Sequence, residues 1–542
     1  MLASVLTAAL LGALGAAAAR TDAHHPPLPP AGARAAPPEE LLASHWYRDA
    51  RDAIEARRAK LRFGATAGAR NVVMFLGDGM SLPTLAAART LLGQRERRPG
   101  EEAQLSFEAF PTLGLAKTYC VDAQTADSAC SATAYLCGAK ANGGTLGLSA
   151  AVPRRDCGAS QAPAARLQSV AAWALAAGRD AGVVTTTRIT HASPAGTYAH
   201  AAERNWESDA DVRASGVDVG ACPDIAHQLV HLAPGNQFKV ILGGGRRMFL
   251  NDTLVDEEGT PGERADGRNL IEEWQADKAR RNVSYQYAWN REQLLHANAT
   301  LPEYLLGLFE GNHLRYNLET DPATEPTLAE LTEVAIRMLS RNEKGFFLFV
   351  EGGRIDHAHH DNRARLALDE TIELSAAVAR AVRLLDEADS LVVVTADHTH
   401  VMAFNGYSAR GADVLGPSRS RDADGVPYMT LSYTNGPGRR PDVDGRRPDV
   451  TREPDVGSPR WRTHVDVPLA SETHGSDDVP VFAWGAHHEM FSGLYEQSHV
   501  PHRMAYAGCF GGGPQACDAA AAPSALALPL VATLLALLRA LA

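Results

Sequence analysis

Residues 71–79 read Asn-Val-Val-Met-Phe-Leu-Gly-Asp-Gly, a short apolar run that ends in an acid between two glycines. Such a run predicts a buried strand with Asp78 at its carboxyl end. The pattern recurs: residues 182–187, 346–350 and 391–395 are apolar or β-branched, and polar side chains follow each of them. Residues 240–245 have the same strand pattern but carry no candidate ligand.

Helical patterns lie between these strands, at residues 165–177, 328–340 and 363–387. The alternation predicts an α/β fold, a three-layer sandwich with a large, mostly parallel central sheet flanked by helices. In such sheets ligands bind beyond the carboxyl ends of the strands. Residues 40–61 have the spacing of an amphipathic helix that packs on the body or on a second subunit.

Residues 405–471 are rich in Gly, Pro, Arg and Asp and contain one strand pattern near residues 428–433. We expect a small, crown-like subdomain there, inserted before the last strand, with its charges on a solvated face. With 542 residues, 45% of them hydrophobic, the chain can bury a large core. A formal net charge of -12 argues against nucleic acid as the main partner, because binding to phosphate backbones needs clustered Lys and Arg.

Residues 125–134, Thr-Ala-Asp-Ser-Ala-Cys-Ser-Ala-Thr-Ala, place Ser128 directly after Asp127 where a loop enters a predicted helix. The free amides and the positive dipole end of a helix favour an anion, so a hydroxyl there could attack a phosphoryl group. On this stretch alone the alternative is that Asp127 or Ser128 is only an N-cap, because Ser and Asp are common caps.

Metal-ligand side chains gather at the predicted strand ends. These are Asp78, Glu351, Asp356, His360, Asp397, His398 and, later in the chain, His474. Asp356 and His360 are four residues apart, so on a helical turn they face the same way. Each residue alone is more often structural, but the set together with Ser128 predicts a metal site. His and Asp mixtures without Cys suit Zn²⁺, and all-oxygen sets suit Mg²⁺.

The two ends of the chain have the composition of targeting segments. Residues 1–19 are apolar and rich in Ala and Leu, which is typical of a secretory signal peptide, and residues 20–39 are Pro- and Ala-rich and expected to be extended. Residues 518–542 combine small residues with an apolar run, as in a GPI-attachment signal. A tail-anchored helix is the rival interpretation of that run.

Seven cysteines leave at least one thiol unpaired, and their spacing does not settle the connectivity. Cys509 and Cys517 enclose a Gly-Gly-Gly-Pro turn and form the simplest local pair. Glycosylation sequons at Asn251, Asn282 and Asn298 agree with secretion.

Six segments, taken together and in order, resemble the motif set of alkaline phosphatases, specifically the animal, membrane-anchored branch. They are residues 71–81, 127–140, 191–200, 346–360, 392–401 and 472–478. The resemblance covers residues 40–517. It implies an enzyme that hydrolyses a broad range of phosphate monoesters to alcohol and inorganic phosphate through a phosphoserine intermediate. It also implies two zinc ions, one magnesium ion, a homodimer, and a GPI anchor on the extracellular face of the plasma membrane.

The resemblance assigns a role to each candidate residue. Ser128 matches the nucleophile, and Arg204 matches the arginine that clamps two phosphate oxygens, for which its fork geometry is suited. The first zinc takes Asp356, His360 and His474; the second takes Asp78, Ser128, Asp397 and His398; magnesium takes Asp78, Ser193 and Glu351. Asp127, His191 and His357 are expected around these ligands.

A calcium site away from the chemistry is also implied, at Phe309 through its carbonyl, Glu310 and Glu325, with Glu257 chosen among the acids of residues 256–258. The implied disulfides are Cys157 with Cys222 and Cys509 with Cys517, with Cys137 as a free thiol. Cys120 and Cys130 depart from the family pattern. Because Cys130 lies two residues beyond Ser128, an extra thiol or a bridge to Cys120 is expected to affect activity or metal loading.

Two other classes of function are alternatives for this sequence. A sulfatase or phosphodiesterase can share this fold, but a sulfatase needs Cys or Ser followed two residues later by Pro and then Arg, and residues 128–131 have neither. A non-catalytic surface protein that keeps the fold for adhesion would be indicated by a lost metal ligand, and no ligand is missing from the sequence.

Overall fold

The computed structural model describes residues 37–60, 68–406, 408–421 and 423–517. The predicted signal peptide, residues 20–36 of the Pro- and Ala-rich segment and the predicted anchor signal at 518–542 lie outside these ranges. Within the described ranges, no helix combines the length and the apolar character that crossing a bilayer requires.

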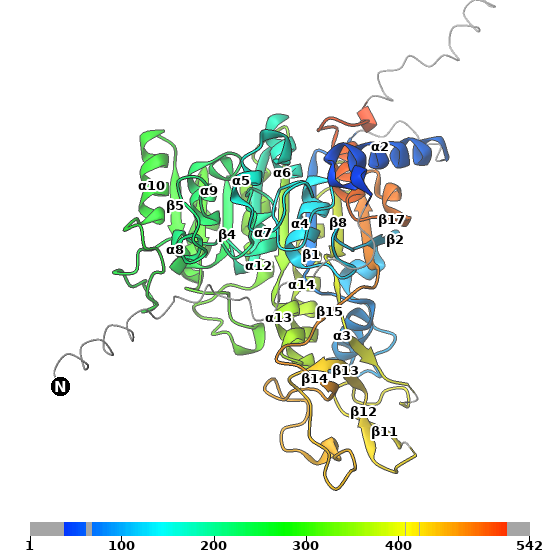
Figure 1. Ribbon diagram of the computed structural model, residues 1–542. Coiled ribbons are helices and arrows are strands. Elements are labelled where there is room, and N and C mark those ends of the chain that lie inside the picture. The colour runs from blue at the N-terminus through cyan, green and yellow to red at the C-terminus, as the bar shows by residue number, and fades with distance from the viewer. Residues whose placement is uncertain (1–36, 61–67, 407, 422, 518–542) are drawn as a thin grey trace, which may run out of the picture.

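A ten-stranded sheet forms the centre of the molecule (Figure 1). In spatial order its strands are β17 (Gly493–Glu496), β2 (Thr112–Lys117), β16 (Val479–Gly485), β8 (Ser390–Ala396), β1 (Asn71–Gly77), β7 (Phe346–Gly352), β3 (Asp180–Arg188), β4 (Val240–Gly244), β6 (Tyr304–Leu308) and β5 (Tyr285–Ala288). From β8 to β5 every neighbouring pair is parallel, and β16 runs antiparallel to β8 and β2.

Every residue of β1, β7 and β8 is buried, as expected for parallel strands covered on both faces. One group of packed helices comprises α3 (Leu82–Arg95), α12 (Leu328–Leu339) and α14 (Ala364–Leu384). A second group comprises α4 (Ser128–Cys137), α6 (Val170–Ala176) and α15 (His499–Gly508). The predicted three-layer α/β class is confirmed.

The remaining helices are shorter or peripheral. They are α2 (Ala43–Lys60), which packs on α15, α5 (Cys157–Ser160), α7 (Ala192–Ala195), α8 (Asp209–Ala214), α9 (Ile225–His231), α10 (Leu270–Arg280), α11 (Arg291–Thr300) and α13 (Arg354–His360). The helix expected at 165–177 begins only at Val170, because Pro163 sits in a 3₁₀ turn and the Ser169 hydroxyl accepts a hydrogen bond from Ala172 N as the N-cap.

A smaller sheet lies at the opposite end of Figure 1 from α2. It consists of β10 (Met402–Phe404), β13 (Leu431–Gly436) and β14 (Val465–Pro468), and β11 (Pro417–Arg421) pairs with β12 (Pro427–Met429) beside it. The single strand expected near 428–433 is therefore two strands, β12 and β13. The chain then returns to the main body through β15 (His474–Gly475), which pairs with β9 (Thr399–His400).

Candidate active site and metal centre

Three neighbouring strands deliver carboxylates to one edge of the sheet. Leu76 of β1 lies opposite Glu351 of β7 and Thr395 of β8. Asp78 and Asp397 directly follow the last residues of β1 and β8, so parallel pairing brings these acids together beside Glu351. All three side chains are fully buried. The sequence expectation for the strand ends and the arrangement in the structure agree.

A second set of ligands comes from α13 and β15. Asp356 and His360 lie one turn apart on α13, and Nε2 of His360 is 3.4 Å from Oδ1 of Asp356. Nε2 of His474, on β15, lies 3.3 Å from that same oxygen and 3.1 Å from Nε2 of His360. The three side chains predicted for the first zinc are therefore mutually within reach of one ion.

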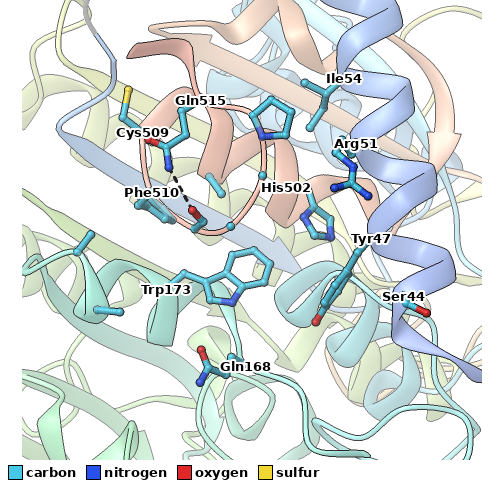
Figure 2. Close-up of a pocket in the computed structure, with 17 residues that line it drawn as sticks. Ser44, Tyr47, Arg51, Ile54, Gln168, Trp173, His502, Cys509, Phe510 and Gln515 are labelled. Carbon is cyan, nitrogen blue, oxygen red and sulfur yellow. Dashed lines mark hydrogen bonds between the residues drawn. The ribbon is translucent and has the colours of Figure 1, made fainter. Parts of the chain in front are cut away.

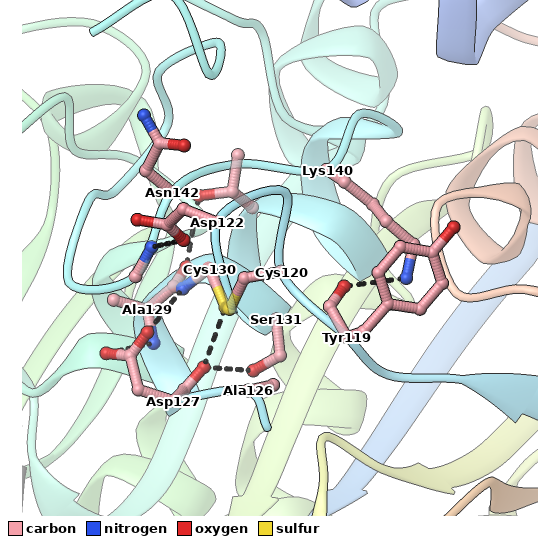
Figure 3. The surroundings of a disulfide bond; sticks show 12 residues. Tyr119, Cys120, Asp122, Ala126, Asp127, Ala129, Cys130, Ser131, Lys140 and Asn142 are labelled. Carbon is pink, nitrogen blue, oxygen red and sulfur yellow. Dashed lines mark hydrogen bonds between the residues drawn. A yellow bond between two sulfur atoms is a disulfide. The ribbon is translucent and has the colours of Figure 1, made fainter. Parts of the chain in front are cut away.

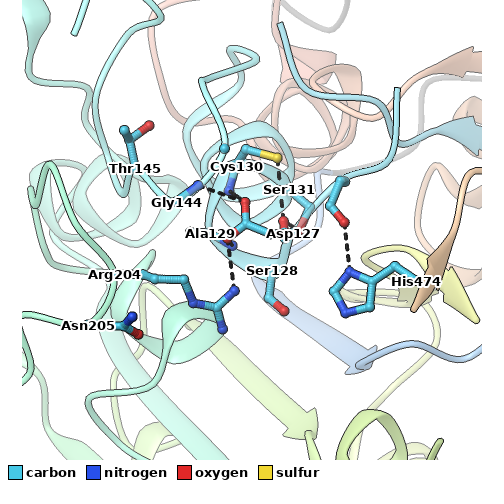
Figure 4. Close-up of polar contacts among 12 residues, drawn as sticks. Asp127, Ser128, Ala129, Cys130, Ser131, Gly144, Thr145, Arg204, Asn205 and His474 are labelled. Atoms are coloured by element: carbon cyan, nitrogen blue, oxygen red, sulfur yellow. Dashed lines mark hydrogen bonds and ion pairs between the residues drawn. The ribbon is translucent and has the colours of Figure 1, made fainter. Parts of the chain in front are cut away.

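Ser128 is the first residue of α4, and Asp127 is its N-cap, accepting hydrogen bonds from the amides of Ala129 and Cys130. Figure 4 shows Ser128 at the start of this helix, on the side of the site that also holds Arg204 and His474. The buried Ser128 Oγ lies 3.2 Å from Nε2 of His398. The ring of His398 lies 3.0 Å from Asp397 and 3.5 Å from Asp78, so all four residues predicted for the second zinc meet.

The residues predicted to bind magnesium are Asp78, Ser193 and Glu351. Asp78, Glu351 and His191 form one group whose ligand atoms lie within 4.8 Å of one another. Ser193, on the short helix α7, is buried, and its hydroxyl has no hydrogen-bond partner among the described residues. The hydroxyls of Thr185 and Thr187 donate to Oε2 of Glu351. Oxygen ligands predominate here, which suits a hard cation.

The electrostatics of these acids favour bound cations. Burial, followed by the charges of Asp397, Asp356 and Glu351, raises the pKa of Asp78 well above its ordinary value. Burial also raises the pKa of Glu351 to about 7. Burial opposes ionisation of Asp356 as well, but the neighbouring His360 and His400 hold its pKa well below the ordinary value. Positive charge placed among these side chains would relieve the repulsion.

Several ligand atoms have no protein partner, although such atoms are costly to bury. Among the described residues, neither carboxylate oxygen of Asp78 accepts a hydrogen bond, and the same holds for Oε1 of Glu351 and Oδ2 of Asp356. The mixture of carboxylate, imidazole and hydroxyl groups without cysteine matches what Zn²⁺ and Mg²⁺ bind. The side chains present thus fit divalent cations.

Arg204 lies beside Ser128 and is held from two sides. Its Nη1 donates to Oδ2 of Asp127 at 2.9 Å (Figure 4). Its Nη2 lies 3.2 Å from Nε2 of His191. The ring of His191 contacts that of His357, with centroids 5.4 Å apart. Asp127 and His191 therefore contact the guanidinium of Arg204, and His357 packs against His191.

The sequence reasoning missed His400 and Glu472. Nε2 of His400 lies 2.7 Å from Oδ1 of Asp356, and its Nδ1 contacts Oε2 of Glu472. Burial disfavours the charged imidazole, but Glu472 and Asp356 raise the pKa of His400 to about 10. His400 follows His398 by two residues, but His398 lies between β8 and β9, so alternation along a strand does not mark His400 as a partner of the ligands.

Glu310 and Glu325, both predicted to bind calcium, interact with each other. Burial, followed by the charge of Glu310, raises the pKa of Glu325 to about 8. The pKa of Glu310 is raised by burial and by the charge of Glu258. Oε2 of Glu257, the acid chosen from sequence, lies 3.7 Å from Nε of Arg246. Of the acids at residues 256–258, Glu258 is the one whose charge acts on Glu310.

The structure joins Cys157 to Cys222 and Cys509 to Cys517, and it leaves the buried Cys137 as a free thiol. Cys120 is joined to Cys130, so these two departures from the family pattern form a third bridge. Of the sequon residues, Asn282 is exposed, and Asn251 and Asn298 are half-buried.

A cavity of about 780 Å³ lies between α2, α6, α15 and residues 509–515. Figure 2 shows Tyr47, Trp173 and His502 around it. None of the predicted metal ligands lines this cavity, so it is separate from the catalytic candidates.

Comparisons with known proteins agree with the function that the geometry of the site indicates. The alkaline phosphatase family model matches residues 69–510. The membrane-bound alkaline phosphatase of Bombyx mori is 66% identical over 517 residues, covering 94% of both chains. The tissue-nonspecific isozyme of Mus musculus is 43% identical, covering 91% of this chain and 95% of its own.

Solved structures agree in fold. The alkaline phosphatase of Thermus thermophilus superposes with a TM-score of 0.57 at 24% identity, covering 81% of this chain and 91% of its own. That of the Antarctic bacterium TAB5 gives 0.55 at 18% identity, covering 82% and 100%. With the motifs, the site and the family match in agreement, the chain belongs to the alkaline phosphatase family.

Proposed function

We propose that this alkaline phosphatase hydrolyses phosphate monoesters through a covalent phosphoserine at Ser128, with two zinc ions and one magnesium ion bound by the residues described above. The observation that carries the proposal is the convergence of buried carboxylates and imidazoles on one serine hydroxyl, 3.2 Å from His398. Metal-binding geometry of this kind around a nucleophile is what phosphoryl transfer requires, because the reaction is catalysed mainly by positioning and charge stabilisation.

Asp356, His360 and His474 would hold the first zinc, and Asp78, Asp397 and His398, with Ser128, the second. Asp78, Ser193 and Glu351 would hold magnesium. When bound, these cations supply positive charge that lowers the pKa of coordinated groups and neutralises the phosphate oxygens. His400 and Glu472 would orient Asp356 from behind, as partners of ligand residues commonly do.

The chain's own side chains carry the two displacement steps. The oxygen of Ser128 bonds to phosphorus as the bond to the ester oxygen breaks, and the alcohol leaves with the proton that the serine gives up. Water then attacks the phosphoserine, the bond from phosphorus to Ser128 breaks, one proton of the water passes to the Ser128 oxygen, and inorganic phosphate is released. Arg204 holds two phosphoryl oxygens throughout, in the orientation that Asp127 fixes at 2.9 Å.

Broad substrate range follows from where the polar groups lie. The metal site and Arg204 both bind the phosphoryl group, so few contacts remain to select the alcohol.

A calcium ion would be bound away from the chemistry. Its ligands would be Glu310, Glu325, the carbonyl of Phe309 and an acid from residues 256–258, Glu257 or Glu258. The raised pKa values of Glu310 and Glu325 support a cation there.

For the chain as a whole we propose a signal peptide at residues 1–19, a linker at 20–39, a catalytic domain at 40–517 with an inserted crown-like subdomain at about 405–471, and a GPI-attachment signal at 518–542. Homodimerisation, glycosylation at Asn251, Asn282 and Asn298, and placement on the extracellular face of the plasma membrane complete the proposal. The name of the Bombyx mori relative, a membrane-bound alkaline phosphatase, supports membrane attachment.

The test combines metal analysis with substrate comparison on the purified protein. We expect about two zinc ions and about one magnesium ion per chain, with turnover of an aryl phosphate that rises toward alkaline pH. Aryl sulfate and phosphodiester turnover under the same conditions should be far slower. An active preparation without zinc would contradict the metal assignment, and preferential sulfate or diester turnover would favour the rival enzymes on this fold.

A further inference from the structure

A disulfide closes the loop that carries the proposed nucleophile. Cys120, just after β2, is bonded to Cys130 in the first turn of α4, two residues beyond Ser128 (Figure 3). Both cysteines are buried, with 3% and 2% of their surface exposed. The closed loop at residues 120–130 therefore contains both Asp127 and Ser128. We call it the nucleophile loop.

The apolar side chains of the nucleophile loop are small apart from Val121, which packs, with Ala129, against the main core. The small core around the disulfide consists of Cys120, Ala126, Cys130 and Ala141, with Ala123 partly buried against it. Alanine side chains bury one methyl group each, so their hydrophobic contribution is small. Asp122 and Gln124 are exposed. The covalent bridge thus supplies a constraint that side-chain packing does not.

The nucleophile loop fixes the carboxylate that orients Arg204. Oδ1 of Asp127 accepts hydrogen bonds from the amides of Cys130, at 3.2 Å, and Gly144, at 2.9 Å. Oδ2 of Asp127 accepts from Nη1 of Arg204 at 2.9 Å. Because Cys130 also carries the disulfide, the bridge and the guanidinium are linked through one carboxylate.

The same loop contacts a proposed zinc ligand. The carbonyl of Ala126 accepts a hydrogen bond from Nδ1 of His474 at 2.7 Å. The hydroxyl of Ser131, one turn beyond Asp127, donates to the Asp127 carbonyl at 3.0 Å. Movement of the loop would therefore change the orientation of both Arg204 and His474.

We propose that the Cys120–Cys130 disulfide is a positioning element for phosphate binding, which holds Asp127, and through Asp127 the guanidinium of Arg204, in the orientation that clamps the phosphoryl oxygens. The inference rests on the proposed function, in which Arg204 binds those oxygens. Its main consequence is a tighter complex with phosphate, beyond any gain in stability that a cross-link gives.

The test removes the bridge with Cys120→Ala/Cys130→Ala in the full chain and measures the inhibition constant of inorganic phosphate and KM for an aryl phosphate. We expect both constants to rise about fivefold or more, because the clamp is no longer pre-oriented. The matched control is Cys509→Ala/Cys517→Ala, which opens a loop of similar length, with a sequence separation of 8 against 10. The control should lower thermal stability and change both constants by less than about twofold.

A double-mutant cycle separates positioning from general loosening. In an Arg204→Ala background, loss of the bridge should change the phosphate inhibition constant by less than about twofold, since the group that it positions is gone. An unchanged constant in the bridge variant, or an equal change with and without Arg204, would overturn the inference. If Arg204→Ala by itself leaves phosphate affinity intact, the proposed role of Arg204 is wrong instead.

Where the alanine pair is not recovered folded, Cys120→Ser/Cys130→Ser is measured under the same criteria, because its hydroxyls can keep a hydrogen bond without the covalent link. Zinc content is measured alongside. A loss of zinc with unchanged phosphate affinity per zinc-loaded site would show that the bridge positions His474. That result would contradict the proposed positioning of Arg204.

Discussion

Two groups of buried carboxylates in this protein differ in how their negative charge is neutralised. The ligand group, at the carboxyl edge of the sheet, consists of Asp78, Glu351, Asp356 and Asp397. The arginine-paired group, beyond β3 and β4, consists of Glu207, Asp224 and Asp256 with their partners Arg188, Arg264 and Arg246. Both groups are buried, but only the second has a fixed guanidinium for each acid.

The pairing in the second group is complete. Both nitrogens of the Arg264 fork donate to Asp224, at 2.9 and 3.0 Å, and Nε of Arg246 donates to Asp256 at 2.9 Å. Burial alone would raise the pKa of Glu207, but Arg188 lowers it below the ordinary value. In the ligand group the acids repel one another and leave oxygens unpartnered. The difference indicates that the arginine-paired group stabilises the fold and that the ligand group binds cations.

The largest effect should come from Asp78, which both the second zinc and the magnesium share. Asp78→Asn keeps the size of the side chain but removes a charge, and we expect kcat/KM to fall by about a thousandfold or more. The measurement is turnover of an aryl phosphate, with zinc and magnesium content of the same sample. If Asp78→Asn keeps wild-type turnover and full metal content, Asp78 is not a metal ligand.

Removal of the cations tests the ligand group as a whole. Exhaustive chelation should lower activity by about a hundredfold or more and lower the melting temperature, because the repelling acids lose their counter-charges. Zinc and magnesium together should restore both. Activity that survives chelation, with metal analysis confirming the loss, would contradict the comparison.

Breaking the arginine-paired group should affect stability instead of chemistry. Arg264→Met leaves the buried Asp224 without its partner, and we expect a loss of about 3–5 kcal/mol in the free energy of unfolding. The kcat of the folded fraction should stay within about twofold of wild type, because no substrate contact changes. Denaturant titration and turnover on the same preparation separate the two effects. A drop in kcat comparable to that of Asp78→Asn would contradict the different roles of the arginine-paired group and the ligand group.

The pair Glu310 and Glu325 is an intermediate case, because Arg315 contacts Glu310 at 2.9 Å and yet the pKa of both acids is raised. If calcium neutralises the pair, calcium should raise the melting temperature of the wild type by about 3–5 °C. Glu325→Gln should abolish most of that response while leaving zinc content and kcat unchanged. An equal calcium response in the variant would place the ion elsewhere.

The smallest effect concerns Glu370 on α14, a buried acid that belongs to neither group. Burial raises its pKa to about 8, while the amide of Asn317 donates to its Oε1 at 2.7 Å. The folded state therefore binds a proton that the unfolded chain has lost above its ordinary pKa, so this contribution to stability is present at low pH and is lost as pH rises toward 8.

Glu370→Gln keeps the acceptor for Asn317 and removes the titration. Between pH 6 and 9 the wild type should lose about 2–4 °C more in melting temperature than the variant does, and the measurement is thermal unfolding across pH. Parallel curves for the two proteins would show that Glu370 is ionised in the fold throughout.

Much of the fold was predictable because its strands are continuous apolar runs. The acids that follow β1 and β8 could be located from sequence alone, since parallel pairing carries strand ends to one edge. The resemblance supplied residues whose role depends on distant parts of the chain, such as His474, which reaches the site only through the pairing of β15 with β9.

What the sequence did not predict depends on long-range contacts between side chains. His400 interacts with Asp356 across 44 residues and with Glu472 across 72, and no local pattern encodes such distances. The bridge between Cys120 and Cys130 was one of several possible outcomes for an odd set of cysteines. The choice of Glu257 among the acids at residues 256–258 stays a prediction, because three adjacent acids cannot be ranked without their orientations, and the charge of Glu258 acts on Glu310.

The central claim is that the Ser128 hydroxyl becomes covalently attached to phosphate. The direct measurement is acid quenching of the enzyme during turnover of an aryl phosphate, followed by mass spectrometry of the peptide that contains residues 125–134. The account predicts a phosphate on Ser128 in the wild type, and neither label nor turnover in Ser128→Ala. A label on another residue, or turnover that persists in Ser128→Ala, would contradict it.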